Sequence, residues 1–204
     1  MSTGSRAQDL VVDGVALRLR VTHKPVKNVN ARLVGDELRV SAPPHLPDDE
    51  LRRLVVRLAR RLLRRARAHQ LNRGPEAVEL ARRVAARFPQ PPDVAEVRFV
   101  TTQLARWGSY SRRTGAVRLN ASLREMPSWV LEAVMAHELA HVFHGDHSQA
   151  FWALLRRVCP DTDRARAFLE GASWTARRWE RLPAVERALL TGDDDGRRAT
   201  PGRG

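Results

Sequence analysis

The chain has 204 residues, of which 43% are hydrophobic, enough to bury the core of one medium domain or of a compact domain with a small appendage. No run of about 18 apolar residues occurs, which excludes a transmembrane helix by the usual length criterion. The single cysteine, Cys159, excludes an internal disulfide and is typical of a reducing compartment, so we expect a cytoplasmic protein.

The chain is strongly basic, with a formal net charge of +13 and 36 basic residues. Only Lys24 and Lys27 are lysines, so 34 of the 36 are arginines. Two interpretations remain open. The arginines can form a surface for nucleic acid or another polyanion, or they can simply keep the exposed faces of helices solvated.

The N-terminal part alternates apolar and polar residues up to about Ser41. We expect residues 1–8 to be a disordered leader and the alternating segments that follow to form a three-stranded antiparallel meander. The proline-rich stretch at 42–47 ends it, because proline cannot donate to a strand ladder.

Two helices are expected next. The first runs from Asp48 to about Leu71, with apolar residues on one side and arginines on the other, and the second runs from Pro75 to about Arg87. A proline-rich break at 88–92 then divides the chain. We therefore predict an N-terminal unit of strands and Arg-rich helices at 9–92, a second unit at 93–190 and a disordered tail at 191–204.

The second unit begins with strand signals and continues with helix signals. A strand is expected at 97–101, a hairpin turn at Thr114-Gly115 and a strand at 116–119. Helices follow from about Ser128 to His144, from the capping residue Ser148 to Val158, and from residue 160 to Gly171. Strands and helices follow each other in blocks, so the predicted fold class is α+β.

A His-Glu-x-x-His motif lies at residues 137–141, among strong helix formers. Residues four apart share one helix face, so the imidazoles of His137 and His141 can bind one metal ion. Glu138 is turned about 100° around the axis, which places it to take a proton from a water in the open coordination position. Zinc suits this set because it accepts imidazole nitrogens in tetrahedral geometry. The motif predicts a zinc-dependent hydrolase.

A catalytic zinc needs a third protein ligand, and two further histidines follow the motif. On a continuous helix His144 would lie about 10 Å along the axis from His137, too far for one ion to bind both of them and His141. His147 follows Gly145, where helices commonly end, and a reversal of the chain there can return it to the ion. Both histidines are candidates for the third ligand, and His147 is favoured because it can reach the ion.

The motif belongs to a series of short motifs in a fixed order. They are Arg106-Trp107-Gly108-Ser109, the segment 115–120, Leu123, Pro127, the motif at 137–141, His147-Ser148 and Phe151-Trp152. This series resembles the YgjP-like metallopeptidases, a family related to the SprT-like proteases. The resemblance is close over residues 97–160 and looser in the N-terminal part.

The resemblance implies a zinc ion on His137, His141 and His147, with Glu138 as the general base of peptide-bond hydrolysis. It also implies a minigluzincin-like core, in which a small sheet packs on the active-site helix and its edge strand pairs with an extended substrate. We expect this edge strand at 116–120, because an exposed edge offers unpaired backbone groups to a peptide. Phe151 and Trp152 are expected to pack against the loop of His147.

The chain departs from the family pattern at Tyr110, where the family usually has cysteine. A phenol can donate a hydrogen bond to developing negative charge, so Tyr110 is a candidate catalytic residue that stabilises the oxyanion. The alternative is that Tyr110 only packs, with its hydroxyl at the surface.

Two other functions remain open. The Arg-rich helix at 48–71 suits a nucleic-acid-associated protein, with or without proteolysis of bound proteins. Against a dedicated nucleic-acid binder, the sequence has no helix-turn-helix or zinc-finger pattern, and aromatic residues make up only 5%. The second is a metal hydrolase that acts on something other than peptides, since a fold does not determine a substrate.

Overall fold

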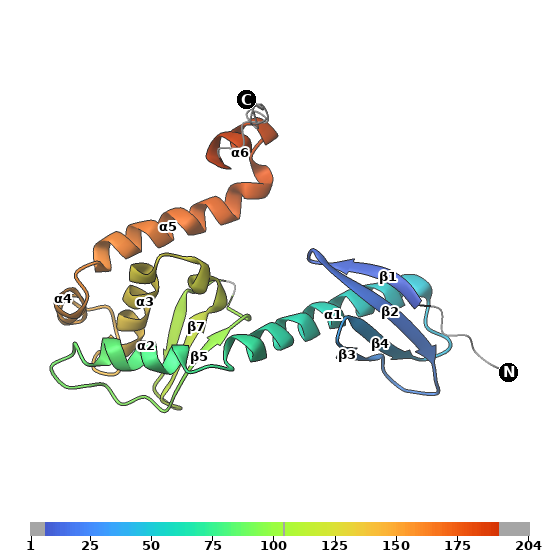
Figure 1. The fold of residues 1–204 in the computed structure, drawn as a ribbon, viewed down its shortest axis with the longest axis horizontal. Helices are drawn as coiled ribbons and strands as arrows, with labels where there is room; N and C mark the ends of the chain where they lie inside the picture. Colours follow the sequence, from blue (N-terminus) through green and yellow to red (C-terminus); the bar gives the residue numbers. More distant parts are fainter. Residues whose placement is uncertain (1–6, 104, 192–204) are drawn as a thin grey trace, which may run out of the picture.

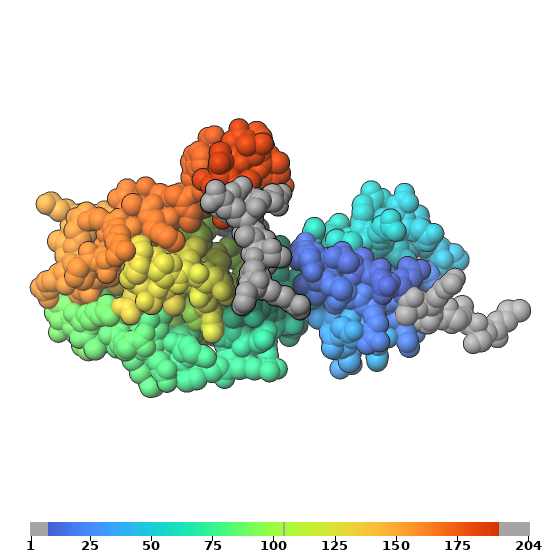
Figure 2. Space-filling model, turned by 45° about the horizontal axis from the view of Figure 1, so that its top comes forward, coloured from blue at the N-terminus to red at the C-terminus, as the bar shows by residue number. Residues whose placement is uncertain are grey.

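The computed structural model describes residues 7–103 and 105–191, and within them the architecture is α+β, as predicted. Figure 1 shows two lobes connected by one long helix, and in the space-filling view of Figure 2 the N-terminal lobe is blue. Each lobe has its own cluster of buried hydrophobic side chains. Among the helices of the described residues, none is long and apolar enough to cross a membrane.

The N-terminal lobe contains a four-stranded sheet in the order β1-β2-β4-β3. Its strands are β1 (Ala7–Val12), β2 (Val15–His23), β3 (Asn30–Val34) and β4 (Glu37–Ala42). The expected three-stranded antiparallel meander is wrong, because β2 and β4 are parallel neighbours. The connection at 24–29 carries the chain to the far side of the sheet, so β3 becomes the edge strand and β4 turns back beside β2.

The expected leader is shorter than predicted. β1 begins at Ala7 and pairs with β2 along its whole length, so residues 7 and 8 belong to the sheet. The remainder of the predicted leader, residues 1–6, lies outside the described residues. A tight turn at Asp13-Gly14, both with positive φ, connects β1 to β2, which is the backbone geometry that two-residue hairpin turns favour.

Helix α1 (Asp48–Leu71) has the predicted bounds. Three acidic residues occupy its first turn, where they oppose the positive end of the helix dipole. Leu51, Val55 and Ala59 are buried in the N-terminal cluster, whereas Leu71 is buried in the C-terminal one. The two hydrophobic clusters therefore share this helix.

Helix α2 (Glu76–Ala85) packs with the C-terminal cluster through Ala77, Leu80 and Val84. From the sequence, residues up to 92 are expected to belong with the N-terminal strands. The buried side chains divide the chain earlier, within α1, because the apolar face of α2 is covered by the C-terminal lobe.

The C-terminal lobe contains a three-stranded sheet in the order β5-β7-β6. Its strands are β5 (Glu96–Val100), β6 (Gly108–Ser111) and β7 (Ala116–Asn120). The predicted hairpin turn connects β6 to β7, with Gly115 at a φ of 61°. The expectation of an edge strand at 116–120 is wrong, because β7 pairs with β5 on one side and with β6 on the other. The edge strand next to the motif helix is β6.

The remaining elements are helical. They are the 3₁₀ helix η1 (Ala121–Glu125), α3 (Ser128–Ala140), α4 (Gln149–Val158), α5 (Thr162–Arg178), the 3₁₀ turn η2 (Trp179–Arg181) and α6 (Ala184–Thr191). α4 begins after Ser148, as predicted. α3 ends four residues earlier than predicted, and α5 continues through Gly171, which lies in open space inside the helix. Of the predicted tail, residues 192–204 lie outside the described residues.

Candidate metal centre

Helix α3 places the His-Glu-x-x-His motif inside the core of the C-terminal lobe. The helix is apolar on nearly all sides, and Val130, Met135 and Leu139 are fully buried, as expected for a helix surrounded by protein. His137 and Glu138 lie in its last turn, and His141 is the residue that caps its C-terminus. The motif is therefore held on a rigid element with little freedom to move.

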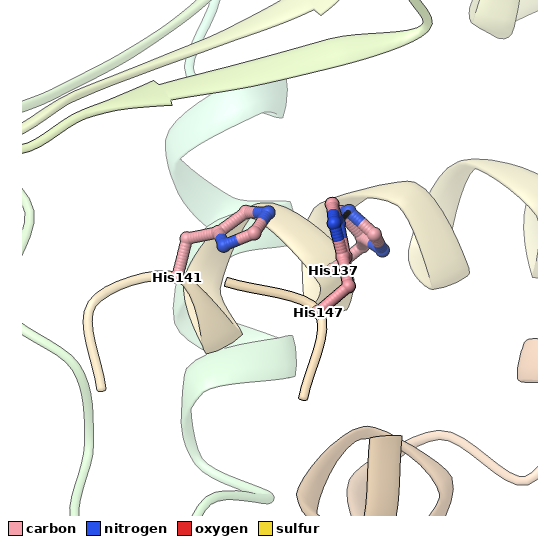
Figure 3. A group of neighbouring side chains, drawn as sticks. All are labelled: His137, His141 and His147. Atoms are coloured by element: carbon pink, nitrogen blue, oxygen red, sulfur yellow. Dashed lines mark hydrogen bonds between the residues drawn. The ribbon is translucent and has the colours of Figure 1, made fainter. Parts of the chain in front are cut away.

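Three histidine side chains converge at the end of α3. His137, His141 and His147 each offer one ring nitrogen, and these three atoms lie within 4.8 Å of one another. Figure 3 shows His147 reaching back from the loop after α3, with its Nε2 atom 3.0 Å from Nε2 of His137. The predicted reversal of the chain after α3 is present.

The geometry of this cluster fits a metal ion. Two imidazole nitrogens bound to one tetrahedral ion lie about 3.3 Å apart, given metal–nitrogen bonds of about 2.0–2.1 Å. The His137–His147 separation of 3.0 Å is close to that value. His141 has its Nδ1 atom 3.0 Å from the carbonyl oxygen of His144, which leaves Nε2 for an ion. A backbone hydrogen bond to the second nitrogen is the usual way to orient a ligating histidine.

His144 has a different role from the one considered for it. Its backbone carbonyl orients His141, while its side chain is not part of the three-histidine group found among the described residues. Because α3 ends at Ala140, a distance estimated along a continuous helix does not apply beyond that point. Which of His144 and His147 joins the other two histidines depends instead on the loop after α3, and this loop returns His147 to the cluster.

The electrostatics of the cluster favour neutral imidazoles. Burial, with smaller contributions from the charges of the neighbouring His141 and His147, lowers the pKa of His137 to about 4. Burial also lowers the pKa of His141. Metal ions bind the neutral form of imidazole, so the protein presents these rings in the protonation state that a ligand needs.

Glu138 lies beside the histidines but is not one of the converging groups. Its side chain is only 5% exposed. Burial raises its pKa to about 7, against the opposing effects of a hydrogen bond from the backbone of Tyr110 and the charge of Arg106. A carboxyl with a pKa near neutrality can both accept and return a proton, which is what general acid–base catalysis requires.

Gly108, at the start of β6, makes room for this carboxyl. A Cβ atom added at Gly108 would overlap the Glu138 carboxylate and lie 2.8 Å from its Cγ. The backbone of the edge strand therefore touches the catalytic candidate directly, and only glycine allows this approach. In the sequence Gly108 is part of a motif but has no assigned role, because the contact depends on how β6 packs on α3.

The loop of His147 is held by aromatic packing, as expected. Phe151 is fully buried, with its ring centroid 4.9 Å from that of His147. The ring of Trp152 stacks on His147 at 5.7 Å. Ser148 caps α4 by accepting a hydrogen bond from the backbone of Phe151. The start of α4 thus holds the third histidine in place.

A cavity of about 500 Å³ opens beside His137 and Glu138. Trp107 and Trp152 form part of its wall, and α5 supplies the side opposite α3 through Arg166, Leu169 and Arg177. Trp107 donates a hydrogen bond to Ser173 of α5. The contribution of α5 was missed, although its lining residues recur every three or four positions on one face of the helix.

Tyr110 lies in β6 and is partly buried against the C-terminal cluster. Its backbone bonds to Glu138, while its side chain is not among those that line the cavity beside His137. Oxyanion stabilisation by Tyr110 therefore stays a prediction.

Comparison with known proteins supports the same assignment. Searches of curated proteins and of solved structures gave no match. Residues 76–172 match the family model described as YgjP-like, metallopeptidase domain. The matched segment begins with α2 and contains Gly108, Glu138 and all three histidines of the cluster. The resemblance seen in the sequence is thereby confirmed for this segment, and residues 76–172 form a YgjP-like metallopeptidase domain.

Proposed function

We propose that this protein is a zinc-dependent peptidase in which His137, His141 and His147 hold the ion and Glu138 is the general base. One observation carries the proposal: three histidine nitrogens converge beside a buried carboxylate that is not one of them. A histidine-only ligand set is typical of catalytic zinc, which keeps a fourth position open.

Zinc, when bound here, would polarise a scissile carbonyl and acidify a water molecule. Glu138 takes the proton from the attacking water and later gives it to the leaving amine. Gly108 and the backbone of Tyr110 hold the carboxyl in one position, so the proton acceptor is oriented before the substrate arrives. In this proposal Tyr110 also donates a hydrogen bond to the oxyanion.

The substrate is an extended peptide that runs along the edge strand β6. This strand pairs with β7 on one side, and an added peptide strand would take the other. A side chain of the peptide enters the cavity between α3 and α5, where Leu169 and the two tryptophans offer apolar surface. The small sheet packed on α3 is then a minigluzincin-type core.

We place this activity in the cytoplasm. Cys159 is free and almost fully buried in the core, an arrangement that needs no oxidising compartment.

Metal analysis and one substitution test the proposal together. We expect about one zinc per chain by elemental analysis and cleavage of a diverse peptide library. Glu138→Gln should keep the zinc and lose a factor of about 10²–10⁴ in turnover, as removal of a general base does. Glu79, one of two exposed glutamates of α2, provides the matched control, and Glu79→Gln should cleave like the unaltered protein. Full activity in Glu138→Gln would refute the assignment.

A further inference from the structure

A long groove of about 1370 Å³ runs along α1 to β5, away from the histidine cluster. Its walls are unusually basic, and Glu96 is the single acidic residue among those that line it. The arginines of its walls are Arg52, Arg53, Arg57, Arg60, Arg61, Arg64, Arg65, Arg73 and Arg98. Much of the net charge of the chain is therefore concentrated along one groove.

The arginines of α1 follow a regular pattern. The pairs at 52/53, 60/61 and 64/65, together with Arg57, recur every four residues, so they lie on one helix face about 6 Å apart along the axis. From Arg52 to His69 the face extends about 26 Å. The side chains thus form a continuous row of positive charge rather than a local patch.

Among the residues that the structure describes, most of these charges have no ion-pair partner. Arg60 pairs with Asp13 at 2.9 Å and Arg98 with Glu96 at 3.2 Å. With the described residues, the other seven arginines of the groove form no ion pair. Arg98 also has a buried Nε atom for which these residues provide no hydrogen-bond acceptor. The row is available to an external anion.

We propose that this groove, the α1–β5 groove, binds the sugar–phosphate backbone of a single strand of nucleic acid. A nucleic acid presents phosphates at regular intervals along a line, which matches a linear row of arginines. The planar guanidinium donates two parallel hydrogen bonds to one phosphate, and arginine is the residue best suited to this contact. The volume of the groove divided by its length of about 26 Å gives a cross-section on the order of 50 Å². This leaves room for one strand.

An extended acidic peptide fits the groove less well, because the edge of β5 is already closed at its centre. The amide of Asn72 donates to the carbonyl of Phe99 and accepts from its N–H, both at 2.8 Å. These are the two backbone groups through which a peptide strand would be added. Thr101 is engaged as well, since its hydroxyl donates to the backbone of Arg64.

The groove recognises the backbone and not the bases. Phe99, the one phenylalanine, tyrosine or tryptophan that lines it, is buried, and the guanidinium of Arg124 lies over its ring. Proteins that stack bases do so on exposed aromatic side chains. We therefore expect binding that is sensitive to salt and indifferent to base sequence.

The groove and the histidine cluster lie at opposite edges of one sheet. β5 borders the groove, β6 borders Glu138, and β7 lies between them. No residue lines both the groove and the cavity beside His137. A substitution in the groove can therefore abolish nucleic-acid binding without affecting peptide hydrolysis, and a substitution in the cavity can do the reverse.

The test is fluorescence anisotropy with a labelled single-stranded oligonucleotide of mixed sequence, over a range of salt concentrations. The variant is Arg53→Gln, Arg57→Gln, Arg61→Gln and Arg65→Gln together, all exposed and none in an ion pair with the described residues. Glutamine keeps the helix propensity, and circular dichroism checks the fold. We expect at least tenfold weaker binding and a salt slope reduced by about 0.7 for each phosphate that the variant no longer neutralises.

The matched control changes four exposed arginines outside the groove, Arg32, Arg82, Arg157 and Arg187, to glutamine. It loses the same net charge and should bind within about twofold of the unaltered protein. Equal loss in both variants would overturn the proposal, as would displacement by poly-glutamate as effective as that by oligonucleotide, or tighter binding of a duplex of the same sequence. Glu138→Gln should bind the oligonucleotide normally, which separates this result from the test of hydrolysis.

Discussion

At the scale of single residues, His137 and Glu138 are neighbours whose pKa values burial shifts in opposite directions. The pKa of His137 falls to about 4 and that of Glu138 rises to about 7. In the metal-free protein both side chains are therefore largely neutral at pH 5 to 6. Burial of two neutral groups is far less costly than burial of two charges, and this explains how the motif is tolerated inside an apolar helix.

These shifts predict a compensated pH dependence for the metal-free protein. Folding lowers the pKa of His137, so stability rises as the pH increases from about 4 to 6.5. Folding raises the pKa of Glu138, so stability falls as the pH increases from about 4.5 to 7. The two effects nearly cancel between pH 4.5 and 6.5. In Glu138→Gln the second effect is gone, so between pH 4.5 and 6.5 the free energy of unfolding should rise with pH more steeply than in the unaltered protein, by about 1.4 kcal/mol per pH unit.

Urea unfolding after treatment with a chelator measures this slope. The lowered pKa of His141 adds to the histidine effect in both proteins and leaves the difference between them unchanged. Glu79→Gln, on the exposed side of α2, should behave like the unaltered protein. Identical pH profiles for Glu138→Gln and the unaltered protein would mean that Glu138 is not desolvated as the structure has it.

Gly108 supports a second prediction at this scale. The methyl group of Gly108→Ala would overlap the Glu138 carboxylate and force it to move. A displacement of about 1 Å at a catalytic group lowers turnover by about 10²-fold. Zinc content should be unchanged, because the atoms nearest to the added methyl group belong to Glu138 and not to a histidine of the cluster. Gly171→Ala, in open space within α5, is the control, and it should keep its turnover and gain about 0.5–1 kcal/mol of stability.

At the scale of elements, the spacing of residues along the chain predicted where helices and turns lie, but it did not predict which strands pair with each other. The bounds of α1, the start of α4 and the turn at Gly115 follow from helix periodicity, a capping serine and a glycine with positive φ. The order of β5, β7 and β6 does not, because the parallel pairing of β5 with β7 brings together strands that are separated in the chain by a loop and by β6. The edge strand was misassigned for this reason.

In the candidate site, too, some residues could be predicted from local spacing and others could not. His137, Glu138 and His141 could be identified from the sequence because one helix fixes their relative positions. His147 was favoured over His144 because a reversal of the chain at Gly145 was expected, and the family resemblance implied the same choice. The contact of Gly108 with Glu138 and the cavity wall supplied by α5 depend on tertiary packing, which spacing along the chain does not determine.

Asn72 supports a prediction about how α1 is attached to the C-terminal sheet. Its amide makes two hydrogen bonds to the backbone of Phe99, so Asn72→Ala leaves a backbone donor and acceptor of β5 without their partner. We expect a loss of about 1–3 kcal/mol in the free energy of unfolding, measured by urea denaturation. Gln70→Ala, an exposed position on the same helix, should cost less than about 0.5 kcal/mol. Equal effects at the two positions would show that Asn72 does not hold the strand.

At the scale of the whole molecule, the metal site belongs to only one of two hydrophobic clusters. The histidines lie against the C-terminal cluster, which includes Phe151, while the β1–β4 sheet has a cluster of its own. A ligand that binds only the folded state stabilises whatever unfolds together with its site, by about 4 kcal/mol at a ligand concentration of 1,000 Kd. Zinc should therefore stabilise the two lobes unequally.

Native-state hydrogen exchange can follow each lobe separately. With zinc at that concentration, amides of α3 and β7 that exchange only through unfolding of the C-terminal lobe should slow about 1,000-fold. Amides of β2 and β4 should change little, because their cluster can open without disturbing the histidines. In His147→Ala, which removes the exposed histidine of the cluster, zinc should slow neither set by this amount. Equal slowing in both lobes would mean that α1, which contributes to both clusters, couples them into one cooperative unit.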